Sequence, residues 1–487
     1  MINFRKCLFY TITLFYAVMC PVLILYALGY IFAPHIDEGL VKTGLIHLES
    51  LPSKAVIRID HRLQPDRTPA TLSDLLPGFH EVEVSSPGYR PWSQRVEVFP
   101  GKASIYDQIL LVTSDTPSRV LAPGPFKNIV AVPAAKLLIL LGGGSKLSEA
   151  AVFDLKDHGL VPLFSDPSAW AGAEVEGIDT VTSSSSVLIR ARRGSGKIYL
   201  WCDLSKKRPE VRDISVLVSA GPPGDFDWDP REHDLLYTYR QGEVSAIHLR
   251  EASVRPVIAR NVSAFGLWER GALTVQSGAV VRYEPGRKKF QGEVLETGEA
   301  IAALFPEGKT YRMRVLGDDL ALFLGAQGEL MANRLPYRFA DHGVLGVDIT
   351  GHGEKVVFWT RERIGVLDFS KARTRKRFFE TGPRVEWIFE AGKQIRRVFW
   401  VNEGSHVLYD DEGALWLREA VQTAGAAAER LASVKADASV AYMEETGDIF
   451  FLHPKTGALE TLGLLPKEKL LGLSLAPSGD VPGRETP

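Results

Sequence analysis

Cysteine is scarce in this sequence, with three residues among 487. Cys7 and Cys20 lie beside or inside an apolar N-terminal segment, which leaves Cys202 alone in the remainder. Neither a disulfide framework nor a zinc site of Cys and His ligands can be built from this set. An excess of one charge is also lacking, because 57 basic residues face 59 acidic residues. No overall field favours nucleic acid, so we expect no nucleic-acid partner.

Charged residues are absent from Leu8–Phe32. A helix over this segment would be roughly 37 Å long at about 1.5 Å per residue, enough to cross a hydrocarbon core of about 30 Å. We therefore predict that residues 1–34 form a cytoplasmic N-terminus and a transmembrane anchor, with the lipid bilayer as the partner of Leu8–Phe32. A lipid anchor at Cys20 fits less well, because Met19 precedes it and apolar residues continue beyond it.

The flanks of the apolar segment predict its orientation. Arg5 and Lys6 precede it and Asp37 and Glu38 follow it, which by the positive-inside rule keeps the N-terminus cytoplasmic. The bulk of the chain would then be extracytoplasmic, in a single-pass protein of the cell membrane. The alternative is a cleaved signal peptide with a small-x-small site at Ala27–Gly29, for which the apolar run is long.

A period of two marks the segment GFHEVEVSS. Val82 and Val84 alternate with Glu81 and Glu83, as in a strand with one buried face. His80 shares the valine face and is a candidate ligand or base. Because no Cys, Asp or second His stands at metal spacing nearby, we expect a half-buried histidine with a packing role.

The same alternation recurs in AVIRID and VEVF, on either side of this strand. We therefore predict a compact antiparallel β-sandwich of about 70 residues, from Thr43 to Leu111. Proline fixes φ and glycine accepts positive φ, so Pro-Gly pairs supply the turns between the strands. These pairs are Pro77-Gly78, Pro87-Gly88 and Pro100-Gly101.

A series of short motifs makes this region specific. In order they are Pro52-Ser53-Lys54-Ala55, Asp60, Thr68-Pro69, Leu76-Pro77-Gly78, Val82-x-Val84 and Gly88-Tyr89 with Trp92. This order resembles the PEGA domain, to which we assign residues 43–112. The segments YALGY (Tyr26–Tyr30) and KTG (Lys42–Gly44) are similar to those of single-pass PEGA proteins on bacterial surfaces.

The sequence departs from the PEGA pattern at two positions. Lys54 stands where the family usually has Gly, and His61 follows Asp60 where a hairpin Gly is common. The chain must therefore turn there in another way, and the insert HRLQPDR provides room for it. The resemblance implies an extracytoplasmic spacer or interaction module without catalytic residues, so we expect Tyr89 and Trp92 to be core aromatics.

Hairpins recur beyond Thr113, each with two apolar strands around a polar turn. Their spacing of about 35 to 50 residues is close to the propeller blade period of about 40 to 45. Five turn at Gly242, Gly278, Gly328, Gly413 and Gly447: HDLLYTYRQGEVSAIHL, GALTVQSGAVVRYE, DLALFLGAQGELMAN, SHVLYDDEGALWLRE and SVAYMEETGDIFFLH. Three more fit less strictly: KLLILLGGGSKLSEAAVFDL, SVLIRARRGSGKIYLWCDL and EKVVFWTRERIGVLDF.

A closed ring of such repeats buries sheet faces that a single blade leaves exposed. We therefore predict an all-β fold in which a seven- or eight-bladed β-propeller, residues 118–472, follows the sandwich. DWDPREHDLLY, DITGHGEKVVFW and WVNEGSHVLYD resemble TolB-like and WD40-like blades. All tryptophans but Trp92 are spread from Trp170 to Trp416, as packing between blades requires. The Ala-rich EAVQTAGAAAERLASV predicts a short helix, and residues 473–487 a disordered tail.

Three motifs suggest chemistry, and each has a simpler explanation. Asp225, Asp227 and Asp229 alternate as in a calcium loop, but Pro230 and Leu236 stand where that loop needs Gly and Glu. We expect solvated acids at a blade-entry turn. GGGSK lacks the spacing of a phosphate loop and predicts a flexible turn, while KARTRKR predicts solvated charges more than a site for an anionic wall polymer.

No nucleophile elbow, metalloprotease motif or ordered Ser/His/Asp set is apparent in the sequence. We therefore predict no catalytic, cofactor-binding or metal-binding residues, no cofactor and no enzyme activity. The favoured function is a membrane-anchored scaffold whose propeller binds an envelope protein or glycan, with the PEGA module as spacer. The alternatives are an extracytoplasmic propeller hydrolase acting on a surface polymer, and a purely structural role in envelope assembly.

Overall fold

The structure is a computed structural model, and the chain divides into two compact units at Thr116–Pro117. The residues described are 4–32, 39–114, 118–180, 184–206, 208–218, 225–229, 232, 234–268, 271–276, 278–284, 291–297, 304–306, 308–316, 320–333, 336–351, 353–369, 383–420 and 428–465. KARTRKR and the predicted tail, residues 473–487, lie outside them.

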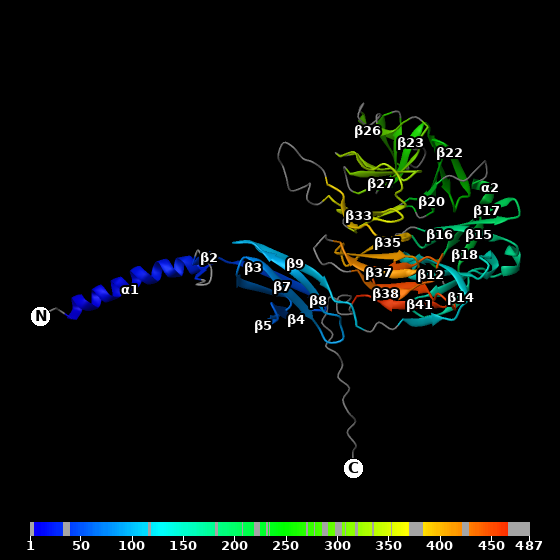
Figure 1. The fold of residues 1–487 in the computed structure, drawn as a ribbon. Coiled ribbons are helices and arrows are strands. Elements are labelled where there is room, and N and C mark those ends of the chain that lie inside the picture. Colours follow the sequence, from blue (N-terminus) through cyan, green and yellow to red (C-terminus); the bar gives the residue numbers. More distant parts are fainter. Residues whose placement is uncertain are drawn as a thin grey trace, which may run out of the picture. The chain divides into compact units, whose positions relative to one another are not determined.

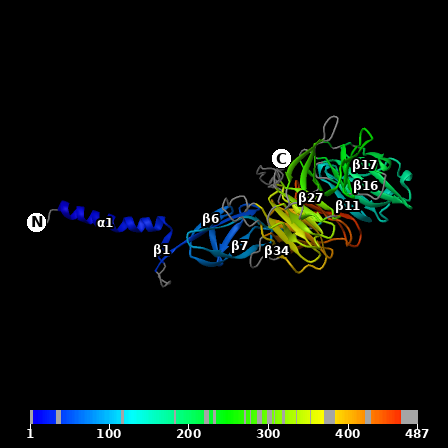
Figure 2. The same cartoon turned by 90° about the horizontal axis from the view of Figure 1, so that it is seen from above.

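The N-terminal apolar segment forms the helix α1 (Phe4–Ala27; Figure 2). Pro21 lies inside this helix. Its window Leu8–Ala27 has a mean hydropathy of 2.2, and none of it is buried. At about 1.5 Å per residue these 20 residues extend about 30 Å, which still matches a hydrocarbon core. The predicted apolar helix is therefore present.

The prediction of a helix as far as Phe32 is wrong, because α1 ends at Ala27. Gly29 has a φ of +80°, a conformation that ends helices and that favours glycine. The next residues form β1 (Tyr30–Phe32), which pairs with β2 (Leu40–Lys42). The segments YALGY and KTG are thus neighbours: the Gly29 carbonyl accepts the Thr43 amide at 2.7 Å.

The small β module consists of two sheets, β5-β4-β7-β8 and β6-β3-β9 (Figure 1). Alternate side chains of both sheets meet in one core that includes Ile46, Leu48, Ile57, Val82 and Val84. Its strands are β3 (Gly44–Leu51), β4 (Val56–Ile59), β5 (Arg62–Arg67), β6 (Ala70–Leu75), β7 (Gly78–Ser85), β8 (Trp92–Val98) and β9 (Ala103–Leu110).

Two details of the module differ from the prediction of an antiparallel sandwich with core aromatics. The chain crosses to the other sheet after β8, so β9 runs parallel to β3 along its whole length. Trp92 and Tyr89 are partly buried at the margin of the core, where Trp92 meets Tyr106 edge to face at 5.7 Å. The aromatics therefore pack on the core, as expected, without being enclosed by it.

At His61, where PEGA domains commonly have a hairpin glycine, the chain forms a tight hairpin. The prediction that the insert HRLQPDR supplies a longer turn is therefore wrong. Asp60 and His61 have φ values of +48° and +65°, as both central residues of a two-residue hairpin loop require. Ile59 and Arg62 pair directly, and Arg62–Arg67 is the strand β5. Aspartate tolerates this conformation better than most residues, and its carboxylate also accepts the amide of Glu81 at 2.9 Å.

After its first strand, the second unit contains three meanders, each of four consecutive antiparallel strands. Short helices η1 (Pro133–Ala135), η2 (Leu147–Glu149), η3 (Pro167–Trp170) and α2 (Ser215–Val218) lie in their connections. The strands are β11 (Phe126–Val132), β12 (Leu137–Gly142), β13 (Ala151–Asp154), β14 (Leu160–Pro162), β15 (Glu174–Thr180), β16 (Ser186–Arg193), β17 (Gly196–Asp203), β18 (Glu210–Asp213), β19 (Asp225–Trp228), β20 (Leu235–Arg240), β21 (Glu243–His248) and β22 (Ser253–Ala259).

Four more meanders follow, of which the first two are joined by a short parallel pairing of their first strands, β23 and β27. Their strands are β23 (Val262–Trp268), β24 (Gly271–Gln276), β25 (Ala279–Glu284), β26 (Gln291–Thr297), β27 (Tyr311–Val315), β28 (Ala321–Gly325), β29 (Leu330–Ala332), β30 (Arg338–Ala340), β31 (Gly346–Ile349), β32 (Lys355–Trp359), β33 (Ile364–Asp368), β34 (Glu386–Phe389), β35 (Ile395–Val401), β36 (His406–Asp411), β37 (Ala414–Glu419) and β38 (Glu429–Ser433).

The last group combines strands from both ends of the unit, in the order β10-β41-β40-β39. Here β39 (Ala441–Met443), β40 (Asp448–Leu452) and β41 (Leu459–Gly463) are consecutive, whereas β10 (Arg119–Ala122) precedes the first meander. In Figure 1, β41 in red lies beside β12 in cyan, and Leu459 of β41 shares a buried apolar cluster with Leu138 of β12. The ring is therefore closed by strand pairing, as a propeller requires, while the exact number of blades, seven or eight, stays a prediction.

The closure has a core of its own and polar contacts around it. Phe126, Leu138 and Phe153 of the first meander pack against Phe450 and Leu452 of the last group. The Phe126 carbonyl accepts the Lys435 ammonium at 2.6 Å, across 309 residues of sequence. The first and last sheets therefore bury each other's faces.

Buried apolar clusters also lie between successive groups elsewhere in the described part of the ring. Trp201 and Trp228 share one cluster and Trp359 and Trp400 another, which confirms for these four that the tryptophans pack between blades. All eight predicted hairpins are present, for example β20–β21 at Gly242 and β36–β37 at Gly413. The prediction of a short helix in the Ala-rich segment is wrong for the second half of that segment, which the structure describes: it contains the strand β38.

Gly124 offers a test of the closure. A Cβ at this position would lie 2.5 Å from the Thr456 carbonyl oxygen and the Gly457 carbonyl carbon, both backbone atoms of the last group. We expect Gly124→Ala to destabilise the propeller by about 1–3 kcal/mol, because no flexible side chain can move aside. The measurement is urea unfolding followed by tryptophan fluorescence. Gly159→Ala is the control, since no atom lies within 4 Å of its Cβ. Equal midpoints for the two variants would contradict the expectation.

Candidate functional site

His80 forms a polar link within the small module. Its Nδ1 lies 2.7 Å from Oδ2 of Asp60, and its Nε2 lies 2.7 Å from the Leu76 carbonyl oxygen. A backbone carbonyl and an ionised carboxylate accept hydrogen bonds, so this geometry favours the protonated ring, which donates from both nitrogens. The prediction of a partly buried histidine is confirmed, but its role is to hold the Asp60 hairpin and not to pack on the valines.

The pKa values of this pair move apart. Burial lowers the pKa of His80, but the hydrogen bonds to Leu76 and Asp60 outweigh it and the net shift is upward. Burial raises the pKa of Asp60, but the hydrogen bonds from His80 and from the Glu81 amide outweigh it and the net shift is downward. The histidine therefore stabilises the module below about pH 6.5 and loses this effect as the pH rises through its raised pKa.

The three aspartates of the calcium-like pattern do not share one environment. Asp227 lies in β19, whereas Asp229 follows the strand and is buried. The carboxylate of Asp229 accepts the hydroxyl of Tyr237 at 3.1 Å and the amide of Glu232 at 2.9 Å. The prediction of solvated acids is therefore wrong for Asp229. Among the described residues, no group of three or more His, Cys, Asp or Glu side chains is placed to hold a metal ion.

GGGSK lies in the connection between β12 and β13, as predicted. Ser145 donates its amide to the Gly142 carbonyl at 3.1 Å, which closes a turn. Lys146 pairs with Glu149 at 3.4 Å. The lysine is thus directed at a carboxylate of its own loop.

A buried histidine that no motif indicated lies at the start of β36. His406 is 4% exposed, and its Nδ1 lies 2.8 Å from the Ser405 hydroxyl. That hydroxyl also contacts the side-chain amide and the carbonyl of Asn402. Burial lowers the pKa of His406 to about 4, so the ring is neutral at pH 7.

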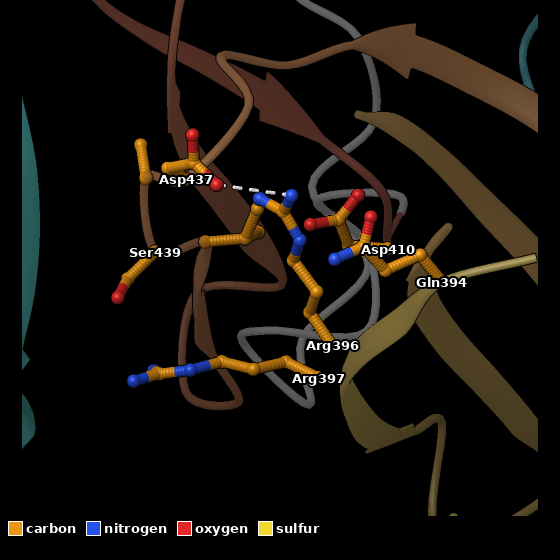
Figure 3. Close-up of a pocket in the computed structure, with 8 residues that line it drawn as sticks. Gln394, Arg396, Arg397, Asp410, Asp437 and Ser439 are labelled. Carbon is orange, nitrogen blue, oxygen red and sulfur yellow. Dashed lines mark ion pairs between the residues drawn. The ribbon is translucent and has the colours of Figure 1, made fainter. Parts of the chain in front are cut away.

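One polar cavity of the propeller lies beside the ring closure (Figure 3). Its volume is about 300 Å³. It is bordered by the start of β35, the end of β36 and the connection from β38 to β39. The lining residues are Gln394, Arg396, Arg397, Asp410, Asp437, Ala438, Ser439 and Val440. We name this feature the closure cavity.

A β-bulge brings two arginines to the closure cavity. Ile395 pairs with Asp411 and Arg397 with Asp410, so Arg396 is the extra residue of the strand. Consecutive side chains of a regular strand point to opposite faces, and a bulge changes that direction. The indole of Trp359, from the neighbouring meander, donates to the Arg396 carbonyl at 3.2 Å and holds the bulge.

The charges of the closure cavity are unevenly paired. Arg396 forms an ion pair with Asp437 at 3.1 Å, marked in Figure 3. Asp410 is 3% exposed, and its carboxylate accepts the Gly413 amide at 3.1 Å. Burial raises the pKa of Asp410, although the Gly413 amide and Arg396 act in the opposite direction. Arg397 is exposed and has no ion pair among the described residues.

No signal in the sequence pointed to this site beyond the letters QIRR before an apolar strand. The motif with the greatest positive charge, KARTRKR, lies outside the described residues. The lining residues come from segments about 40 residues apart in sequence, and only the neighbouring sheets bring them together.

Comparison with known proteins confirms the class of the small module. Residues 43–108 match the PEGA domain family. The chain therefore contains a PEGA domain, within the range predicted from the sequence. No curated protein sequence matches the chain.

Solved structures similar to this chain include β-propellers. The β-propeller domain of Cps50 (Swd1) from Myceliophteria thermophila is 8% identical, with a TM-score of 0.37, and the match covers 71% of this chain and 99% of that one. The WD40 domain of SCAP from fission yeast is 10% identical, with a TM-score of 0.42 and coverage of 72% and 98%.

A bacterial surface protein is also similar. PorZ, a surface component of the type-IX secretion system of Porphyromonas gingivalis, is 14% identical, with a TM-score of 0.38. The match covers 69% of this chain and 42% of PorZ, so this chain spans less than half of that protein. By its own elements, the protein is an all-β chain with an N-terminal apolar helix, a PEGA domain and a propeller fold.

The buried His406 predicts that the stability of the propeller depends on pH. Its folded pKa of about 4 lies below the ordinary value of 6.5, so the unfolded chain binds a proton that the folded chain does not. His406 therefore does not lower the free energy of unfolding above pH 6.5. As the pH decreases from 6.5 to 4, protonation of this histidine in the unfolded chain lowers the free energy of unfolding by about 3 kcal/mol. Urea unfolding at a series of pH values measures it.

The control variant for this prediction is His406→Asn, which keeps a polar atom for Ser405 and removes the titrating ring. We expect it to be less stable at pH 7 but with a shallower loss between pH 6.5 and 4. An equally steep loss in both proteins would assign the effect to other groups.

Proposed function

We propose that the protein is a membrane-anchored interaction protein whose propeller binds a protein or glycan partner outside the membrane, with the PEGA domain as spacer. The observation that carries the proposal is α1, whose window Leu8–Ala27 is apolar and not buried. Exposed apolar surface costs roughly 25 cal/mol per Å² in water, which a bilayer removes. The helix is therefore best explained as an anchor.

The two modules support the rest of the proposal. The PEGA domain buries its own apolar core, which suits a stable spacer. A closed ring leaves few free strand edges and presents loops around its two faces, and loops commonly carry binding residues. The proposal includes no enzyme activity, because the loops around the two faces of the ring are sufficient for binding a partner.

The anchor is tested by membrane extraction. Leu14 and Leu23 are exposed on α1. In the double variant Leu14→Arg, Leu23→Arg, each arginine raises the free energy of membrane insertion by about 2.5–3.5 kcal/mol. We expect the natural chain to stay in the membrane pellet after alkaline carbonate treatment and the variant to be released. Leu160→Arg with Val161→Arg, on the exposed strand β14, is the matched control and should stay in the pellet. A natural chain that is released and whose N-terminus begins after Gly29 would show a cleaved signal peptide.

Partner binding is tested by crosslinking the full-length protein in detergent to a cell-envelope extract. We expect a recurrent partner whose crosslinks lie on residues 118–463 and compete with excess unlabelled protein. Crosslinks confined to residues 43–112 would contradict the division of roles. Release of smaller fragments from an envelope polymer would support the hydrolase alternative instead.

A further inference from the structure

The closure cavity contains one guanidinium group whose hydrogen bonding is incomplete. Arg396 donates to Asp437 through Nη2, while its Nη1 is buried without a hydrogen-bond partner in the described structure. A buried N–H group without a partner is unfavourable, and such groups in natural proteins call for an explanation. An acceptor supplied by a ligand would satisfy it.

A second guanidinium group lies next to the first. Arg397 follows the bulge residue and lines the same cavity, and its side chain has no ion pair or hydrogen bond among the described residues. Guanidinium groups bind carboxylate and phosphate oxygens with short, charge-assisted and often bidentate hydrogen bonds. Two of them at one cavity favour an oxyanion over a neutral acceptor.

The remaining lining indicates what else the ligand carries. The Ser439 hydroxyl and the Gln394 amide both line the cavity, and neither side chain has a partner in the described part of the chain. Hydroxyl and amide groups can each donate to and accept from the hydroxyls of a ligand. The volume of about 300 Å³ is at the lower limit of ligand sites and suits a group of monosaccharide size.

We propose that the closure cavity binds a sugar-sized acidic ligand through one carboxylate or phosphate group, held by Arg396 and Arg397. The proposal rests on the proposed function, since it gives the propeller a ligand class. The two arginines supply the charge, and Ser439 and Gln394 contact the hydroxyl groups.

Asp410 opposes this binding and thereby provides a test of the charge argument. Its buried carboxylate lines the same cavity and, when ionised, repels an oxyanion. Asn at this position keeps an oxygen acceptor for the Gly413 amide and removes the charge. The variant Asp410→Asn should therefore bind the ligand more tightly than the natural chain.

The experiment is calorimetric titration of the full-length protein in detergent with glucuronate, glucose 6-phosphate and glucose. We expect saturable binding of at least one acid, weakened about tenfold or more in Arg397→Gln and tightened in Asp410→Asn. Glucose, which lacks the oxyanion, should not bind. Preference between the two acids distinguishes carboxylate from phosphate recognition.

The matched control is Arg314→Gln, because Arg314 is an exposed arginine on β27 that does not line the cavity. Its affinity should equal that of the natural chain. The proposal is overturned by no saturable binding up to about 50 mM, by equal binding of glucose, or by equal losses in Arg314→Gln and Arg397→Gln.

Failure of this site and failure of the proposed function give different results. If the natural chain and Arg397→Gln capture the envelope partner equally well and the natural chain binds neither acid, the proposed function stands and this site does not. If the natural chain binds an acid but captures no macromolecular partner, the site stands and the partner does not.

Discussion

The pairing of β10 with β41 is the contact on which the large unit depends. Each sheet of the ring has two apolar faces, and both are buried only if a neighbour covers each side. Phe126 and Leu138 at the start of the unit meet Phe450 and Leu452 at its end, so the first and last sheets satisfy this condition together. The contact joins residues more than 300 positions apart, so closing the ring carries a large loss of chain entropy that the buried faces must offset.

The same closure positions the polar residues that have the clearest capacity for binding. Ser439 precedes β39, and its amide donates to Asn128 of the first meander at 2.7 Å. Arg396 and Arg397 lie on the other side of the cavity, at a bulge held by Trp359. A ligand bound in this cavity would therefore contact side chains that are held in place by the same contacts that close the ring. Side chains held in place before binding lose less conformational entropy when a ligand binds.

Two histidines give the modules opposite responses to pH. His80 of the PEGA domain lies between two acceptors that raise its pKa, so its protonated form stabilises the hairpin at acidic pH. His406 of the propeller is neutral and buried, so it favours the folded state at neutral pH and above. The difference follows from the surroundings: Asp60 compensates the charge of the His80 ring, while the His406 ring is buried and contacts the neutral Ser405 hydroxyl.

Local patterns of the sequence determined the apolar helix, the strands around Val82 and Val84, and the eight hairpins, because side-chain period and turn glycines act over a few residues. Tertiary structure alone decided the parallel pairing of β3 with β9, the tight turn at Asp60, the burial of Asp229 and the meeting of Arg396 with Asp437. Each of these depends on a contact between distant segments, and no period in the sequence records which segments become neighbours.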